Sequence, residues 1–339
     1  MCTGTRTRCT VESAKWAEIL AQAILHTLVA SLFVEALVRS WRVADPGQRM
    51  ALRVTALGYP LVLFPALVLA FPARGGDEFR ERWAIFAGRS WADLHFLGID
   101  LFTWWVLLFA GLGALLFLMD LWPLVRGRRR PRLVAGPADG PEPAAVAGAL
   151  PELARALDIA TPPMVFLDRE APVLFCTGVR RPAIVVSRGT VTLLDPDELR
   201  AALAHELAHV SGRDPLKSWI AMGARALMCL NPAFQVVARA VARDAEALAD
   251  ERAAAVCGDR LALASGLLKL HRATARWPAV PRTLPFAAAL AEPLARVRSR
   301  DVELRCRRLL DGAPLPLPYG RVRILLAGAA LTALLFFVV

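Results

Sequence analysis

The chain has 339 residues with a formal net charge of +11, and 56% of its residues are hydrophobic against 21% that are charged. Its mean hydropathy of +0.44 is high for a water-soluble protein of this length and favours a membrane protein. The positive charge does not predict nucleic-acid binding. It is almost all arginine, and its densest run adjoins an apolar stretch, where anionic headgroups would meet it.

Three apolar stretches occupy the first part of the chain, at about residues 16–38, 51–71 and 96–125. Each is long enough to cross a bilayer as a helix, which takes about 20 residues. They predict an N-terminal three-span helical bundle at residues 1–126. The last stretch, 324–339, is short, but arginines at its start can reach the headgroups, so we expect a C-terminal transmembrane helix there.

Arginine residues beside the spans predict the orientation in the membrane. The loop after the first span carries Arg39, Arg42, Arg49 and Arg53, and the basic run 126–132 follows the third span. Both basic segments are cytoplasmic only if the N-terminus is outside, although basic residues before the first span argue mildly against this. We therefore expect a multi-pass protein of the plasma membrane whose region after the third span lies in the cytoplasm.

A basic linker rich in proline, glycine and alanine is expected at 127–146, and a larger domain at 147–320. A helix at 150–157 should open that domain. Three short strand-like runs follow, at Met164–Leu167, Val173–Cys176 and Ala183–Ser187. Turns are expected after the second run, at 177–178, and after the third, at 188–189. The fold class is therefore a mainly α membrane protein with a cytoplasmic α+β domain that contains a small sheet.

The next helix carries the most informative motif of the chain, HELAH at residues 205–209. Asp195 is a predicted N-cap, Pro196 suits the first helical position, and Glu198 completes a capping box. Gly212 predicts the end of the helix. The motif therefore lies well inside a capped helix.

Within that helix, His205 and His209 stand one turn apart on one face, where both imidazoles can bind one zinc ion. Glu206 lies about 100° further round, where its carboxylate can accept a proton from water. A helix that carries two histidines by chance is the alternative. Zinc usually has three protein ligands at a catalytic site, so a third must come from elsewhere.

The third ligand is best sought on the next helix, which should begin at Asn231-Pro232 and end at Gly258. Glu246 and Asp250 are four residues apart and hence share a face of it. We expect Glu246 to complete a site for one Zn²⁺ per chain, and Asp250 to hold a ligand histidine by its other ring nitrogen. The alternative is that both belong to a solvated acidic face.

Two membrane-related segments contain polar interruptions. His26 and Glu35 fall within the first span and should face the interior of the bundle, because polar groups are costly in lipid. The apolar residues of 216–241 are interrupted, which predicts a helical hairpin lying on or dipping into the bilayer with Trp219 near the interface. Burial of this segment inside the cytoplasmic domain is the alternative.

At this point the chain resembles a known group. HELAH followed by the EALAD of Glu246–Asp250 is similar to the gluzincin membrane peptidases, and most closely to the beta-lactam sensor-transducer or antirepressor peptidases. Heat-shock and CAAX-prenyl-type membrane proteases resemble it more distantly. Further matching segments extend the resemblance over 147–312: residues 176–186, 213–214, 231–232 and 305–310. Because the sequence ends at Val339, we expect it to lack the extracellular sensor domain of the sensor-transducers.

The resemblance implies that the two histidines and Glu246 bind zinc, that Glu206 is the general base, and that substrates are proteins or peptides. We expect a zinc metalloendopeptidase that cuts cytoplasmic or membrane-proximal proteins in regulated proteolysis or signal transduction, with a transcriptional repressor as one candidate substrate. His271 is the candidate transition-state stabiliser. The substrate should add as a strand to the sheet edge formed by Val173–Cys176 or Ala183–Ser187, and Pro182 favours the latter.

Two other functions stay open. The first is quality control of membrane proteins by the same chemistry. The second is a non-catalytic signalling scaffold with a structural zinc site, against which the presence of Glu206 argues. The bilayer is an expected partner, nucleic acid is not, and a homodimer is one alternative for the oligomeric state.

Overall fold

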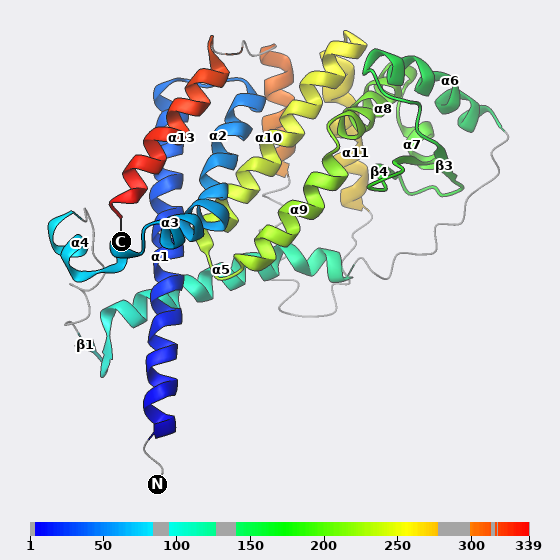
Figure 1. Cartoon of the computed structure of the whole chain (residues 1–339). Helices are drawn as coiled ribbons and strands as arrows, with labels where there is room; N and C mark the ends of the chain where they lie inside the picture. The colour runs from blue at the N-terminus through cyan, green and yellow to red at the C-terminus, as the bar shows by residue number, and fades with distance from the viewer. Residues whose placement is uncertain are drawn as a thin grey trace. The chain divides into compact units, whose positions relative to one another are not determined.

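The computed structural model describes residues 4–83, 95–126, 140–276, 299–312, 316 and 318–338 (Figure 1). The chain divides into two compact units. The first consists of Met1–Trp122, Ala221–Asp244 and Leu315–Val339, and the second of Pro123–Ile220 and Ala245–Pro314. Helices dominate both units, and the described strands form two small sheets, so the expected mainly α fold is confirmed.

Helices of very different lengths make up most of the first unit. In chain order its elements are α1 (Gly4–Ser40), α2 (Pro46–Gly58), the π-helical turn η1 (Tyr59–Leu63), α3 (Phe64–Ala70), the 3₁₀ turn η2 (Pro72–Gly75), α4 (Asp77–Arg82), β1 (His95–Phe96), β2 (Ile99–Asp100), most of α5 (Leu101–Arg126), the second part of α9 (Asp214–Leu227), the first part of α10 (Pro232–Cys257) and α13 (Gly320–Phe336). The last helix packs against α1 and α2 although it lies at the other end of the sequence.

Among the described residues, two helical segments are long and apolar enough to cross a membrane, Leu20–Ser40 and Pro46–Ala70. A shorter apolar stretch, Thr103–Met119, lies in α5. That helix begins later than residue 96 because β1 and β2 form a hairpin and Asp100 caps the helix through the backbone N–H of Thr103. The third span and the C-terminal span stay predictions.

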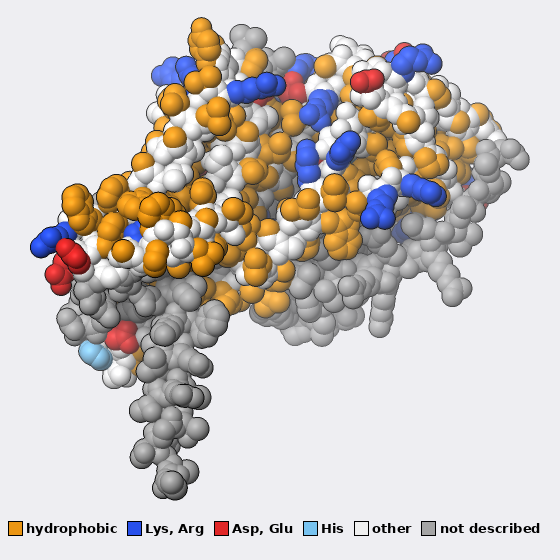
Figure 2. Space-filling view, in the orientation of Figure 1, with side chains coloured by type: hydrophobic (Ala, Val, Ile, Leu, Met, Phe, Trp, Pro, Cys, Tyr) orange, Lys and Arg blue, Asp and Glu red, His pale blue; other side chains and the backbone are white. Residues whose placement is uncertain are grey.

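The second candidate span is not a uniform α-helix. Pro60 is the second residue of the π-helical turn Tyr59–Leu63, which separates α2 from α3. Because proline has no backbone N–H, it breaks the regular ladder, and a π turn is one way to absorb the break. Figure 2 shows hydrophobic side chains gathered over α3, and the exposed residues Val62, Leu69 and Phe71 belong to this part of the segment. Such a surface suits a lipid environment.

Polar residues of the first span face the interior, as expected. His26 is buried, and its Nε2 lies 2.8 Å from the carbonyl oxygen of Val338. Glu35 accepts a hydrogen bond of 2.6 Å from Arg53. Arg49 and Arg53 were expected in a loop, but α2 already begins at Pro46, and both arginines form ion pairs inside the first unit. They therefore give less support to the predicted orientation than the loop arginines do.

The second unit contains the sheet and the helices around it. Its elements are α6 (Pro141–Ala156), β3 (Met164–Leu167), β4 (Leu174–Thr177), β5 (Ala183–Ser187), α7 (Arg188–Leu193), α8 (Pro196–Ser211), the first part of α9 (Asp214–Leu227), the second part of α10 (Pro232–Cys257), α11 (Arg260–Arg276) and a helix at 299–311. Because α6 begins at Pro141, the last residues of the predicted linker are helical. The turn predicted at 188–189 is instead the start of α7, which Ser187 caps.

The sheet has the order β3-β5-β4, with β3 parallel and β4 antiparallel to β5. The expectation that Ala183–Ser187 is an edge strand was therefore wrong. Pro182 precedes the strand, so its missing N–H leaves the ladder of β5 intact. The strand at the edge next to α8 is β4.

The core of the second unit surrounds α8. Leu203 and Leu207 of this helix are fully buried together with Ile184 and Val186 of β5 and Leu263 of α11. One face of α8 is therefore held between the sheet and two helices, which fixes the other face for the motif histidines.

The helix α9 has no fully buried residue, and most of its residues from Leu216 onward are exposed. Trp219 is 70% exposed. In the second half of the segment 216–241, by contrast, Phe234 and Val237 of α10 are buried. Burial inside the cytoplasmic domain therefore stays an open alternative. The placement of the α9–α10 hairpin on or in the bilayer stays a prediction.

Candidate metal centre

The start of α8 is fixed by the predicted capping box. Asp195 accepts a hydrogen bond of 2.9 Å from the backbone N–H of Glu198, and Glu198 accepts one of 3.0 Å from the N–H of Asp195. The buried Glu198 also binds Ser265 at 2.6 Å and Lys269 at 2.5 Å, both on α11. The cap therefore sets the helix start and ties α8 to a neighbouring helix.

The three predicted ligands converge. Nε2 of His205 lies 3.1 Å from Nε2 of His209, and the carboxylate of Glu246 lies 3.6 Å from the first and 3.7 Å from the second. Zinc bonds of about 2.0–2.1 Å in a tetrahedral site separate ligand atoms by about 3.3–3.4 Å. Two imidazoles and one carboxylate are also the donors of catalytic zinc sites. The residues therefore fit a zinc ion by geometry and by chemistry.

Each histidine has a carboxylate on its other ring nitrogen. Asp250 lies 3.0 Å from Nδ1 of His205, although off the direction of a linear hydrogen bond, and Asp214 lies 2.9 Å from Nδ1 of His209. Such contacts set the ring orientation and leave Nε2 to the metal. The sequence predicted Asp250. The contact of Asp214 with His209 was not predicted from the sequence, although the position of Asp214 shortly after the motif could have indicated it.

Arg305 is a further residue of this centre that sequence reasoning did not assign. Its guanidinium donates two hydrogen bonds of 2.7 Å to Asp250 and lies 3.1 Å from Glu246. It also approaches Nε2 of His205 at 3.3 Å. Since that nitrogen is a predicted metal ligand, the arginine must leave it for a metal to bind. The resemblance at 305–310 was the only signal for this residue.

The carboxylates of the centre are held ionised by the basic groups beside them. Burial alone would raise the pKa of Glu246, but His205 and Arg305 outweigh it and bring the pKa to about 2. Arg305 and His205 likewise outweigh burial at Asp250 and bring its pKa to about 2. Burial would lower the pKa of His205, yet Asp250 and Glu246 raise it to about 9. The carboxylates are thus ionised at neutral pH and hold positive charge between them.

The predicted general base lies between the metal site and the sheet edge. Burial raises the pKa of Glu206, although the two histidines pull it down. Its carboxylate accepts a hydrogen bond of 2.8 Å from the backbone N–H of Cys176 on β4. Burial and then the charge of Glu206 raise the pKa of the Cys176 thiol to about 12, so this cysteine stays protonated and is a poor zinc ligand.

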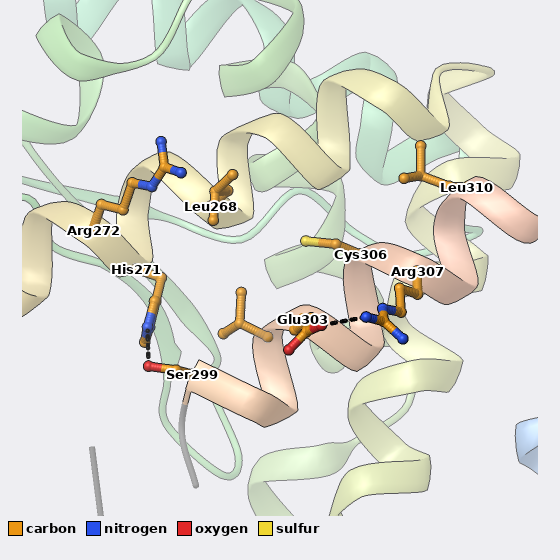
Figure 3. A pocket seen from close by; sticks show the side chains of 9 residues that line it. Leu268, His271, Arg272, Ser299, Glu303, Cys306, Arg307 and Leu310 are labelled. Carbon is orange, nitrogen blue, oxygen red and sulfur yellow. Dashed lines mark hydrogen bonds and ion pairs between the residues drawn. The ribbon is translucent and has the colours of Figure 1, made fainter. Parts of the chain in front are cut away.

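His271 is placed elsewhere in the second unit. It lies on α11 with its Nε2 3.2 Å from the hydroxyl of Ser299, in a hollow of about 610 Å³ between α11 and the helix at 299–311 (Figure 3). The predicted metal ligands do not belong to the lining of this hollow. This position gives no support to His271 as the transition-state stabiliser.

A capped HExxH helix, with a glutamate from a second helix facing its histidines, defines the gluzincin class of metal centre. In keeping with this class, residues 143–306 match peptidase family M48, whose members are zinc metallopeptidases. This matching segment contains all the converging residues described above, so the resemblance to that family includes the whole candidate site. The more specific resemblance to the beta-lactam sensor-transducers stays a prediction.

Several curated relatives are named "Protease HtpX homolog". The one from Aquifex aeolicus is 30% identical over 169 residues, which are 38% of this chain and 56% of that protein. The one from Ralstonia pickettii is 34% identical over 175 residues, 42% of this chain and 58% of that protein. The one from Salinibacter ruber is 31% identical over 154 residues, which are 37% of this chain and 55% of that protein. The chain thus spans little more than half the length of these relatives. No solved structure matches it.

Proposed function

We propose that this chain is a membrane-bound zinc metalloendopeptidase that hydrolyses peptide bonds of cytoplasmic or membrane-proximal proteins. The observation that carries the proposal is the convergence of His205, His209 and Glu246, with Glu206 next to them on α8. The family match of residues 143–306 and the protease names of the relatives support it. The two apolar helices of the first unit support attachment to a membrane.

The residues divide the chemistry between them. His205, His209 and Glu246 would hold the zinc ion, which when bound polarises the scissile carbonyl and acidifies water. Glu206 accepts the proton of the attacking water and later donates it to the leaving amine. The pKa of Glu206, raised by burial, brings this carboxyl closer to the operating pH, as general acid–base catalysis requires.

Arg305 is the best-placed group to stabilise the developing oxyanion. Its guanidinium lies beside Glu246 and Asp250, and it always carries a positive charge. Preorganised positive groups of this kind account for a large part of the rate in acyl-transfer enzymes. In our proposal Arg305 takes the role that the sequence analysis gave to His271.

The substrate would bind along β4. The N–H of Ser187 on β5 binds the carbonyl of Val173 at 2.9 Å, so alternate residues from Val173 onward pair with β5. Leu174 and Cys176 therefore direct their backbone groups to the free edge. Because Glu206 already holds the N–H of Cys176, an added substrate strand would run directly past the general base.

Regulated proteolysis is the role that we propose, with the second unit in the cytoplasm and a transcriptional repressor as one candidate substrate. The membrane attachment and a single-strand binding edge favour cleavage of extended, membrane-proximal segments. Quality control of damaged membrane proteins would use the same residues, and the identity of the substrate distinguishes the two roles.

The enzyme proposal is tested with Glu206→Gln. The amide cannot accept a proton but leaves the ligands in place, so the variant should keep its zinc and lose about 10²–10⁴ in rate. Casein cleavage in detergent is measured for wild type and variant, with a chelator control, and zinc by atomic absorption. Equal, chelator-insensitive cleavage by both proteins would refute the proposal, and zinc binding without any turnover would favour the scaffold.

A further inference from the structure

Four charged residues of the first unit form a network that the proposed chemistry does not use. Asp244 of α10 is 2% exposed, and its carboxylate lies 2.5 Å from Arg53 and 3.1 Å from Arg49, both on α2. Arg53 also makes a forked contact with Glu35 of α1, at 2.6 and 3.1 Å. We call these four residues the Asp244 cluster. Two guanidinium groups face two carboxylates, so the cluster is neutral as a whole.

A half-buried network of this kind holds its members in one geometry. Charge-assisted and forked arginine–carboxylate contacts are directional, and removal of one partner leaves an uncompensated charge away from water. Rotation of α10 about its axis would break the contacts of Asp244 with both arginines. The cluster therefore fixes the rotation of α10 at this residue.

Glu246 lies two residues further along the same helix. Two residues turn an α-helix by about 200° and advance it by about 3 Å. Asp244 thus contacts the arginines of α2, while Glu246 and Asp250 project from the opposite side of α10, where His205 and Arg305 contact them. Any change in the rotation of α10 at Asp244 is passed to Glu246 through less than one helical turn.

The first half of α10 has other attachments in the first unit, among them those of Asn231, Gln235 and Arg239. Asn231, at the helix start, donates hydrogen bonds of 2.9 Å to Thr27 and 3.1 Å to the carbonyl of Ala23, both on α1. Arg239 donates one of 2.8 Å to the carbonyl of Leu116 on α5. These contacts hold the axis of α10, and the Asp244 cluster is the attachment nearest to the predicted ligand.

We propose that the Asp244 cluster is a positioning device that aims Glu246 at the metal, an inference that rests on the ligand set of the proposed function. Functional side chains must be held within about 0.5 Å and 10–20° of their working geometry. The cluster would thereby set the affinity of the zinc site through the rotation of α10 at Asp244. Asp244, Arg49 and Arg53 are positioning residues, because none of them contacts the ligands.

The test compares variants of the full-length protein in detergent. Asp244→Asn keeps the size of the side chain but removes the negative charge that Arg49 and Arg53 share, so that Arg53 retains only Glu35. We expect its zinc dissociation constant, measured by competition with a chromogenic chelator, to rise about 10–100-fold, as for loss of a residue that orients a ligand. Asp244→Glu, which keeps the charge, should recover part of this affinity.

Leu52→Ala is the matched control. Leu52 lies on α2 between the two arginines, is 2% exposed and belongs to the apolar core of the first unit. This variant should lower the melting temperature yet keep the zinc affinity of the wild type. An equal loss of affinity in Leu52→Ala would show that general packing, and not the cluster, supports the site. Wild-type affinity in folded Asp244→Asn would also overturn the proposal.

Two further cases are an Asp244→Asn variant that does not fold and a protein that binds zinc without cleaving casein. If Asp244→Asn does not fold, Arg53→Lys replaces it, because lysine keeps the charge but loses the forked contact with Glu35. Unchanged zinc affinity in that variant would then contradict the proposal. If no protein, wild type included, cleaves casein while the zinc affinities follow the expected order, the positioning role stands and the peptidase function falls.

Discussion

The metal centre consists of paired side chains, in which each predicted ligand has a partner that orients it. His205 faces Asp250, His209 faces Asp214, and Glu246 lies beside Arg305. Since an imidazole offers either ring nitrogen, a carboxylate on Nδ1 decides that Nε2 faces the metal. Affinity for zinc should therefore depend on residues that never contact it.

The first prediction at this scale concerns zinc content. His205→Ala should lose most of its zinc, because two ligands remain. Asp214→Asn and Asp250→Asn should bind it about 10–100-fold more weakly, because the rings lose their orientation. Zinc is measured by atomic absorption and chelator competition, with the exposed surface residue Asp168, which is paired with Arg188, changed to Asn as control. Full zinc affinity in Asp214→Asn would exclude an orienting role for that residue.

The second prediction concerns Arg305. Arg305→Met should lower kcat by about 10²–10³, the typical loss for removal of one oxyanion-stabilising group. The zinc affinity should fall less than kcat does, because the ligands themselves remain. Casein cleavage and chelator competition on the same preparation separate the two effects. A variant with wild-type kcat but weak zinc binding would reduce Arg305 to a partner of Asp250.

At the scale of single elements, the cap of α8 and its buried face carry the motif. Asp195→Ala removes the N-cap and should cost about 1 kcal/mol of the free energy of unfolding. Leu203→Ala leaves a cavity under the motif and should cost about 2–5 kcal/mol. Chemical denaturation followed by tryptophan fluorescence measures both. A cost at Asp195 equal to that at Leu203 would contradict the view that core packing, more than capping, holds this helix.

At the scale of the whole molecule, the sequence predicts three leading spans, an external N-terminus and a cytoplasmic metal centre. Reporters fused at Gly140 and after Val339 should therefore report opposite sides of the membrane, cytoplasmic for the first and external for the second. Reporters active only on one side measure this. If both fusions report the same side, either the third or the C-terminal span is not a span.

The sequence by itself determined the features that depend on neighbouring residues. The cap at Asp195, the spacing of His205 and His209, and the spacing of Glu246 and Asp250 all follow from the geometry of one helix. These predictions agree with the structure because a helix places residues four apart on one face whatever surrounds it. The same local motifs carry the resemblance to gluzincin peptidases, and the match of residues 143–306 to peptidase family M48 falls on the same region.

The tertiary structure decided what depends on contacts between distant segments. It put β5 in the centre of the sheet, brought Arg305 to Asp250 across many residues, and enclosed Asp244 between two arginines of α2. Arg74 likewise caps the end of α13 by donating to the carbonyl oxygens of Leu335 and Val338. No local pattern predicts such contacts, because the partner of a charged or backbone group is set by packing, and packing is known only when the chain is folded.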